Sequence, residues 1–179
     1  MVERDRIRLW SLRMAFFGVC VVVIFWKLLP LDALPRAWAG PDLIVALSFA
    51  WVLRRPEYAP PVLIAIILLL ADFLFQRPPG LWAALVLLGS EALKSRAPLL
   101  RDMTFVPEWL TVTVVLVVIT LSYRLIMAVL LLDQAPLGLH LLEMVMTLLA
   151  YPLVVFASAV VLGIRKIKAG DAESLGLRT

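Results

Sequence analysis

The sequence predicts an all-α fold, a polytopic membrane helix bundle of about six transmembrane helices. Hydrophobic residues make up 63% of the 179 residues and the mean hydropathy is +1.00, whereas soluble domains are roughly half apolar. Apolar stretches follow one another along the chain, separated by prolines and charges. All of the 17 Lys and Arg residues except Lys27, Arg36, Arg77 and Arg124 lie in alternate connections or at the two ends. Since basic flanks stay in the cytoplasm, both termini are expected there.

The expected spans are Trp10 to Leu29, Trp38 to Leu53, Pro61 to Phe75, Gly80 to Leu93, Trp109 to Leu132 and Leu137 to Ile164. At about 1.5 Å per residue, the first, fifth and sixth can each cross a ~30 Å hydrocarbon layer. The middle three are short for that. We expect them to form a core shielded by the long helices or to thin the bilayer, with a re-entrant pair as the alternative.

The segments outside the spans divide the chain into three parts. Residues 1–13 alternate Arg with apolar side chains, which predicts a cytoplasmic amphipathic segment on anionic headgroups. Residues 10–168 hold the transmembrane domain, and residues 169–179 are polar and expected to be a flexible cytoplasmic tail. A cleaved signal peptide is the alternative for the first span, since Ala37 and Ala39 form an A-x-A pattern. The long apolar run well upstream of that pattern favours a retained span.

Prolines and tryptophans give the expected register. Prolines fall in connections or at span ends, Pro98 among them, except for Pro152, which predicts a kink near Ala150 to Pro152 in the sixth span. Indole rings favour the headgroup level, so we place Trp10, Trp51 and Trp109 at inner ends and Trp26, Trp38 and Trp82 near outer ends. The pairs Ala46 with Ala50 and Ala159 with Gly163 have the small-x-x-x-small spacing that permits close helix contact.

The composition argues against an enzyme, a metal site or a bound cofactor. There is one cysteine, Cys20, and one histidine, His140, and the familiar motifs for phosphate, zinc or nucleophilic chemistry do not occur. The longest connection, Lys94 to Glu108, is too short for an extramembrane domain. The net charge of +4 reflects the basic flanks, which we expect to meet anionic lipids rather than nucleic acid.

Four ionisable residues are expected within the outer half of the membrane: Asp72, Arg124, His140 and Glu143. Such groups are costly in lipid and therefore suggest a role. The fifth and sixth spans form a hairpin, which predicts an ion pair between Arg124 and Glu143. We also expect Asp72 to accept backbone N–H groups from the turn of Gln76 to Gly80. The favoured interpretation is a structural clasp between helices, and the alternative is a proton or substrate path.

The stretch from Pro41 to Gly80 reads P-D-L-I-V-A-L-S-F-A-W-V-L-R-R-P-E and then L-L-L-A-D-F-L-F-Q-R-P-P-G-L. It resembles the rod-shape-determining protein MreD family, in which a P-(N/D) start, a W-x-L-x-x-P end and a helix with a late aspartate recur. The matching residues are Pro41, Asp42, Trp51 and Pro56 in the first half and Asp72, Pro79 and Gly80 in the second. Tyr151 and Pro152 before a basic ending resemble the last helix of the family, whereas Leu68 stands where the family tends to have glycine.

The resemblance implies a non-enzymatic scaffold subunit of the cell-wall elongation complex in the bacterial inner membrane. The implied partner is an MreC-like bitopic membrane protein, with indirect links to an MreB-like filament, a RodA-type glycosyltransferase and its transpeptidase. Six compact spans are also similar to the substrate-binding component of energy-coupling-factor vitamin transporters, so a small-molecule binding subunit is one alternative and an ion pathway another.

Overall fold

The computed structural model describes residues 2–29, 39–100, 103–161 and 163–164, and within these every regular element is a helix. The helices are α1 (Val2–Leu28), α2 (Leu43–Arg54), α3 (Pro61–Leu74), α4 (Leu81–Leu100), α5 (Phe105–Val129) and α6 (Leu137–Val161). The all-α prediction is confirmed. Arg6–Leu28 of α1 and the whole of α5 and α6 are long and apolar enough to cross a membrane, whereas α2 and α3 are shorter apolar helices. The predicted tail of residues 169–179 and Trp38 lie outside the described residues.

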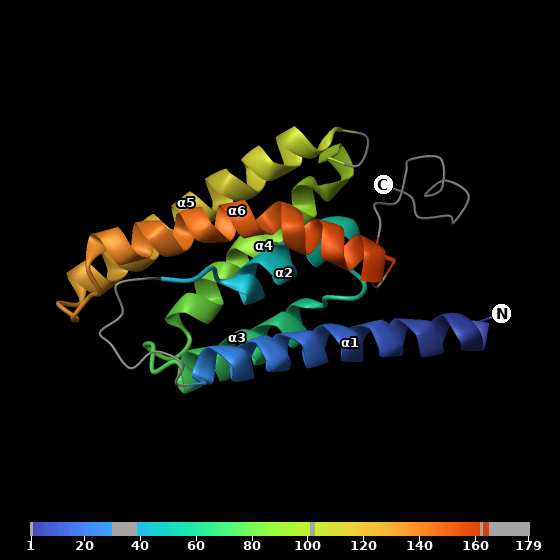
Figure 1. The fold of residues 1–179 in the computed structure, drawn as a ribbon, viewed down its shortest axis with the longest axis horizontal. Helices are drawn as coiled ribbons and strands as arrows, with labels where there is room; N and C mark the ends of the chain where they lie inside the picture. Colours follow the sequence, from blue (N-terminus) through green and yellow to red (C-terminus); the bar gives the residue numbers. More distant parts are fainter. Residues whose placement is uncertain (1, 30–38, 101–102, 162, 165–179) are drawn as a thin grey trace.

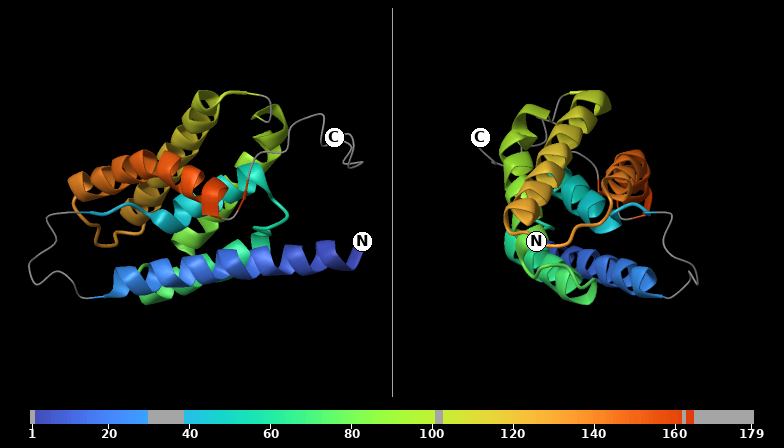
Figure 2. Two further views of the ribbon diagram at one scale, coloured as in Figure 1. Left: turned by 45° about the vertical axis from the view of Figure 1, so that its right-hand side comes forward. Right: turned by 90° about the vertical axis from the view of Figure 1, so that its left-hand side faces the viewer.

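The helices form a bundle with α2 in its interior. Helices α1 and α3 lie side by side on one side, α5 and α6 lie on the opposite side, and α2 and α4 run between them (Figures 1 and 2). Successive helices run in opposite directions, so α2 and α6 are parallel and pack against each other. The first helix continues from Val2 to Leu28, with no break between the expected N-terminal segment and the first span.

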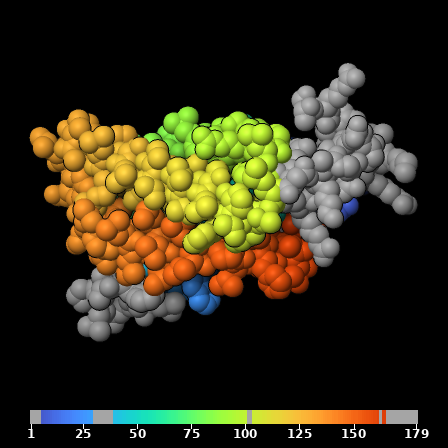
Figure 3. Space-filling model, turned by 90° about the horizontal axis from the view of Figure 1, so that it is seen from above, coloured from blue at the N-terminus to red at the C-terminus, as the bar shows by residue number. Residues whose placement is uncertain are grey.

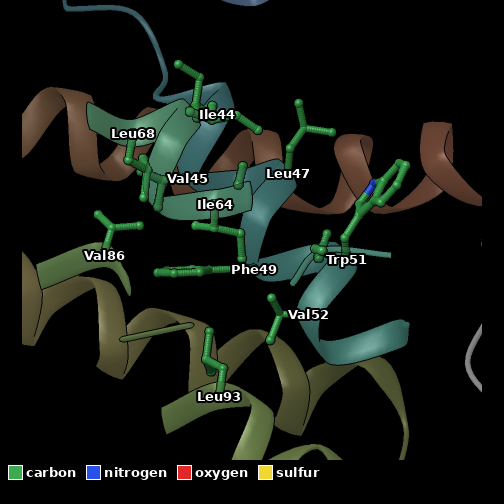
Figure 4. Packing of buried hydrophobic residues seen from close by; sticks show 14 of the residues in the cluster. Ile44, Val45, Leu47, Phe49, Trp51, Val52, Ile64, Leu68, Val86 and Leu93 are labelled. Carbon is green, nitrogen blue, oxygen red and sulfur yellow. The ribbon is translucent and has the colours of Figure 1, made fainter. Parts of the chain in front are cut away.

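Helix α2 is apolar on all sides, and a helix of this kind needs protein contacts around its whole circumference. Every residue from Ile44 to Arg54 is buried. Figure 4 shows Phe49 of α2 reaching toward Val86 and Leu93 of α4, with Ile64 of α3 beside it. The 12 residues of α2 extend over only about 18 Å. Its burial among longer helices explains how so short an apolar helix is accommodated.

Trp51 is enclosed in this core, so its indole does not meet lipid headgroups, which was the reason for placing it at an inner end. Its ring packs on Phe16 of α1 with centroids 4.9 Å apart, and its indole N–H donates to Ser158 Oγ of α6 at 3.2 Å. The apolar ring therefore contacts α1 while its polar atom finds a buried hydroxyl, which removes the need for water.

Helix α4 is longer than predicted because it continues through Pro98 to Leu100. The expectation that Pro98 lies in a connection was wrong. A proline this close to the C-terminal end of a helix removes one hydrogen bond, and burial of Ala97 and Leu100 holds the last turn in place. Gly89 lies where α4 approaches α5, since an added Cβ would come within 2.5 Å of Ile119 Cδ1.

Helix α6 also continues through a proline, Pro152. It ends at Val161, and Gly163 follows with φ 65°, so that Ile164 N–H bonds to Ser158 O at 3.2 Å. Gly163 therefore closes the helix end. Ala159 and Gly163 do not lie on one continuous helix, so the expectation that this pair permits a close contact with another helix was wrong. The other expected pair, Ala46 and Ala50, is buried in α2.

Candidate functional site

Two clusters of buried and half-buried polar residues lie at the two ends of α2. The first, the Asp42 cluster, comprises Lys27, Asp42, Arg77, Glu143 and Thr147. Arg77 Nη1 lies 3.5 Å from Asp42 Oδ2 and its Nη2 lies 3.4 Å from Glu143 Oε1. Lys27 Nζ lies 3.8 Å from the same Glu143 oxygen. The cluster thus joins the end of α1, the start of α2, the α3–α4 connection and α6.

Backbone groups complete the Asp42 cluster. Asp42 caps α2 by accepting from Val45 N–H at 3.4 Å, and its own N–H donates to Thr147 Oγ1 at 2.8 Å. The Thr147 hydroxyl in turn donates to Glu143 O at 2.7 Å. Because the cap residue bonds directly to α6, the start of α2 is fixed to α6 as well as to the neighbouring charges.

Arg77 is the cation between the two carboxylates. This role was not predicted, because a single arginine in a short connection is typical of an ordinary loop charge. Its guanidinium also lies 5.5 Å from the Phe75 ring and 5.3 Å from the Trp82 ring. Burial alone would lower the pKa of Arg77, but Asp42 and Glu143 raise it above its usual range, so the side chain stays charged. Charge complementarity therefore holds the α3–α4 connection against α2 and α6.

The predicted ion pair between Arg124 and Glu143 was wrong. Arg124 Nη1 donates to Ala135 O at 3.3 Å, and Gln134 Nε2 donates to Arg124 O at 3.2 Å. The long arginine side chain reaches along the helix to the polar α5–α6 connection, while Glu143 faces Lys27 and Arg77. Arg124 thus closes the hairpin locally and lies outside the Asp42 cluster.

Asp72 is fully buried and accepts the backbone N–H groups of Gly80 and Ala83, each at 3.1 Å from Oδ2. The predicted bond from the turn to Asp72 is confirmed at Gly80, where φ is 86°. The carboxylate also lies at the N-terminal end of α4, where the helix dipole favours a negative charge. Asp72 therefore fixes the angle at which α3 passes into α4.

His140 stacks on Tyr123, with ring centroids 6.1 Å apart, and Tyr123 meets Trp82 edge to face at 5.3 Å. The four residues considered for a proton or substrate path therefore have separate surroundings. Asp72 bonds to the start of α4, Arg124 to the α5–α6 connection, His140 to an aromatic stack and Glu143 to the Asp42 cluster. This arrangement suits contacts between helices better than a continuous relay.

The second cluster, the Arg54 cluster, comprises Arg54, Glu108 and Tyr151. Arg54 Nη1 contacts Glu108 Oε1, its Nη2 lies 3.4 Å from Oε2, and the Tyr151 hydroxyl donates to Oε1 at 2.8 Å. Glu108 is fully buried, and Arg54 and Tyr151 nearly so. The cluster joins the end of α2, the start of α5 and the middle of α6.

The Arg54 cluster was not predicted, because Arg54 has the position of a cytoplasmic flank and Glu108 the position of a connecting residue. The sequence does contain one indication of this contact. Arg54 ends the second span and Glu108 begins the fifth, which runs in the opposite direction, so the two opposite charges lie at the same end of the bundle. Rotation of each helix about its axis decides whether such charges face one another, and an all-apolar helix such as α2 gives no indication of that rotation.

The MreD-like residues lie along α2 and in the α3–α4 corner. Pro41 and Asp42 precede α2, Trp51 lies within it, Pro56 starts the turn after it, and Asp72, Pro79 and Gly80 form the corner before α4. The two halves of the motif meet where Arg77 contacts Asp42. At Leu68, where the family tends to have glycine, the side chain is buried in the core.

The remaining candidate for a binding site is an open groove of about 450 Å³ beside the Arg54 cluster. Its walls are mostly apolar, formed by Phe105, Pro152, Val155, Phe156, Ala159 and Ile164, with Arg54 at one side. Within the described ranges, no three His, Cys, Asp or Glu side chains are grouped as metal ligands. Comparison of the chain with protein-family models, with curated proteins and with solved structures finds no match.

Proposed function

We propose that this chain is a non-enzymatic integral membrane scaffold, a subunit of a cell-wall elongation complex with an MreC-like bitopic partner. The observation that carries the proposal is the pairing of the buried and half-buried ions. In both clusters at the ends of α2, opposite charges from different helices face one another. Groups used in this way stabilise the arrangement of helices. The resemblance of residues 41–80 to the MreD family is the reason for proposing the cell-wall elongation complex in particular.

The proposal includes six helices that cross or enter the bilayer with both termini in the cytoplasm. Contacts between helices support an arrangement in which successive helices alternate in direction. Arg13 of α1 donates to Glu57 O, which follows α2, and Lys27 at the other end of α1 lies beside Glu143 near the start of α6. The first of these ends carries most of the basic residues, which favours its placement in the cytoplasm.

A small-molecule binding subunit is less well supported. A site of that kind is concave and has several polar groups that converge on the ligand. The groove beside Arg54 is open and mostly apolar. The interior around α2 is filled by aliphatic and aromatic side chains (Figure 4). Packing of this kind suits a rigid support whose outer helix faces contact other membrane helices.

Single cysteines introduced in a Cys20→Ala background test the proposal. Exposed positions on the three long helices, Val22, Val114, Leu121, Leu153 and Val160, would be crosslinked in membranes that contain the MreC-like protein, with the buried positions Ala50 and Val86 as controls. We expect crosslinks to the bitopic protein from exposed positions on one helical face and none from the controls. Recovery of the chain with a stoichiometric vitamin-like molecule, and without such crosslinks, would reject the scaffold.

A further inference from the structure

The open groove beside the Arg54 cluster lies at the end of the bundle where α2 and α6 end and α5 begins. Among the residues that line it, Arg54 is the last residue of α2, Phe105 is the first residue of α5, and Ile164 follows the end of α6. Figure 3 shows α5 and α6 side by side at the surface of the molecule. The groove is therefore open to whatever surrounds the bundle at this end.

The groove is short because α5 and α6 pack together over most of their length. They are in contact where Trp109 of α5 donates to Leu148 O of α6, and beyond that point they diverge (Figures 1 and 2). From Pro152 to Ala159, α6 borders the groove instead, and this stretch is about 10 Å long. Half of a ~30 Å hydrocarbon layer is about 15 Å, so the groove fits within one leaflet.

The walls of the groove are apolar. Pro152, Val155 and Ala159 lie on one face of α6 because they are three and four residues apart, and Phe105 borders the groove from α5. Within a membrane, such a surface can be covered by acyl chains or by another helix. A helix that crosses the membrane would pack along about 30 Å, whereas this groove offers about 10 Å. An acyl chain, which is thin and flexible, fits the groove better.

Arg54 adds a charged hydrogen-bond donor to these apolar walls. Its Nη1 and Nη2 bind Glu108, and the described residues give its Nε–H no hydrogen bond. Only 7% of the side chain is exposed, and Arg54 borders the groove. A largely buried N–H without an acceptor costs free energy, so an occupant that brings an oxygen acceptor is favoured. Phosphate oxygens are strong acceptors for arginine.

Basic residues also follow the groove lining in the sequence. Arg55 comes after Arg54, and Arg165, Lys166 and Lys168 come after Ile164. Ile164 is 1% exposed, so this basic run is attached to the chain at the groove. Glu108 balances the charge of Arg54, and the remaining basic residues give this end an excess of positive charge. An anionic headgroup is therefore favoured over a neutral one at the mouth of the groove.

We propose that the groove holds one anionic phospholipid of the cytoplasmic leaflet. An acyl chain lies along α6 from Pro152 to Ala159, and a phosphate oxygen accepts from the Nε–H of Arg54. The inference rests on the membrane topology of the proposed function and not on its scaffold role. A failure to crosslink the chain to an MreC-like protein would thus leave the lipid site unaffected.

Binding of two lipids to the full chain in detergent micelles tests the proposal. Dioleoylphosphatidylglycerol and dioleoylphosphatidylcholine have the same acyl chains, so a difference in binding reports on the headgroup. Native mass spectrometry over a series of lipid concentrations gives the dissociation constant of the first bound lipid. We expect phosphatidylglycerol to bind about fivefold more tightly or better, as one basic contact with an anionic lipid provides. Equal dissociation constants for the two lipids would overturn the proposal.

Two variants locate the site, each with a matched control. Ala159→Phe fills the groove and should weaken the first phosphatidylglycerol by at least about fivefold, whereas Ala157→Phe, on the exposed face of α6, should not. Arg54→Met combined with Glu108→Leu keeps the apolar walls and should remove the preference for phosphatidylglycerol. Arg96→Gln, an exposed basic residue of α4 outside the groove, should keep that preference.

The proposal is overturned if phosphatidylglycerol binds Ala159→Phe as tightly as the unchanged chain, or if the double variant keeps the headgroup preference. A cysteine at Ala159 separates the remaining occupant from the lipid. Its crosslinking to the bitopic protein, with the lipid constants unchanged by Ala159→Phe, would assign the groove to a partner helix instead.

Discussion

The indole N–H of Trp109 donates to Leu148 O at 3.0 Å, and this is the carbonyl that Pro152 leaves without its helical partner. An α-helix bonds the N–H of each residue to the carbonyl four residues earlier, and proline has no N–H. A side chain of α5 thus supplies the donor that α6 lacks. In an apolar environment, such a replacement is what allows a helix to continue through proline.

Replacement of Trp109 by Phe should lower the free energy of unfolding by about 1 to 3 kcal/mol, because Leu148 O loses its donor. In a Pro152→Ala background, where the helix supplies its own N–H, the same replacement should cost much less. The two single variants and the double variant form a cycle that can be measured by reversible unfolding in detergent micelles. Equal costs in both backgrounds would show that Trp109 acts by packing alone.

Replacement of Asp72 by Ala should impair folding and assembly, because the N–H groups of Gly80 and Ala83 lose a buried acceptor. We expect a loss of about 2 to 4 kcal/mol from the two bonds. Asp72→Asn retains one acceptor oxygen and should keep most of the stability. Glu91→Gln, which alters only the exposed contact with Lys94 at 3.4 Å, is the control. Abundance and partner capture at normal levels in Asp72→Ala would contradict this role.

Removal of one partner of the buried Arg54 cluster should be strongly destabilising. Glu108→Gln leaves the Arg54 charge without its counter-ion, and the expected cost is about 3 to 5 kcal/mol. Arg54→Met combined with Glu108→Leu removes both charges and should recover a large part of that loss. Thermal unfolding of the unchanged chain, of Glu108→Gln and of the double variant checks this order of stability. A double variant less stable than Glu108→Gln would mean that the ion pair contributes more than its desolvation costs.

An alanine at Gly89 should separate α4 from α5. The added Cβ would lie 2.5 Å from Ile119 Cδ1 and 3.0 Å from Val115 Cγ1, and overpacking of this kind typically costs about 1 to 3 kcal/mol. Ile119→Val removes the closest atom and should restore much of the stability of Gly89→Ala. Gly138→Ala, with open space around the added atom, is the matched control. Equal thermal unfolding midpoints for Gly89→Ala and Gly138→Ala would contradict a close contact between α4 and α5 at Gly89.

Some local features follow from particular residues in the sequence. Asp72 stands near the end of an apolar run with a proline and glycine turn just after it, and an aspartate so placed can reach the backbone N–H groups of that turn. The contact with Gly80 could therefore be predicted. Glu143 was also predicted to need a cationic partner, but the partner was wrong, because Arg77 and Lys27 come from elements that are distant in sequence.

The sequence by itself determined that the chain is helical and that α1, α5 and α6 are long and apolar enough to cross a membrane, because length and hydropathy are properties of each segment alone. Only the tertiary structure decided that α2 is the enclosed helix, that Trp51 faces Ser158, and that Arg54 meets Glu108. These outcomes depend on how each helix is rotated about its axis. Helices that are apolar all round have no polar face to fix that rotation, so packing against several neighbours at once must select it.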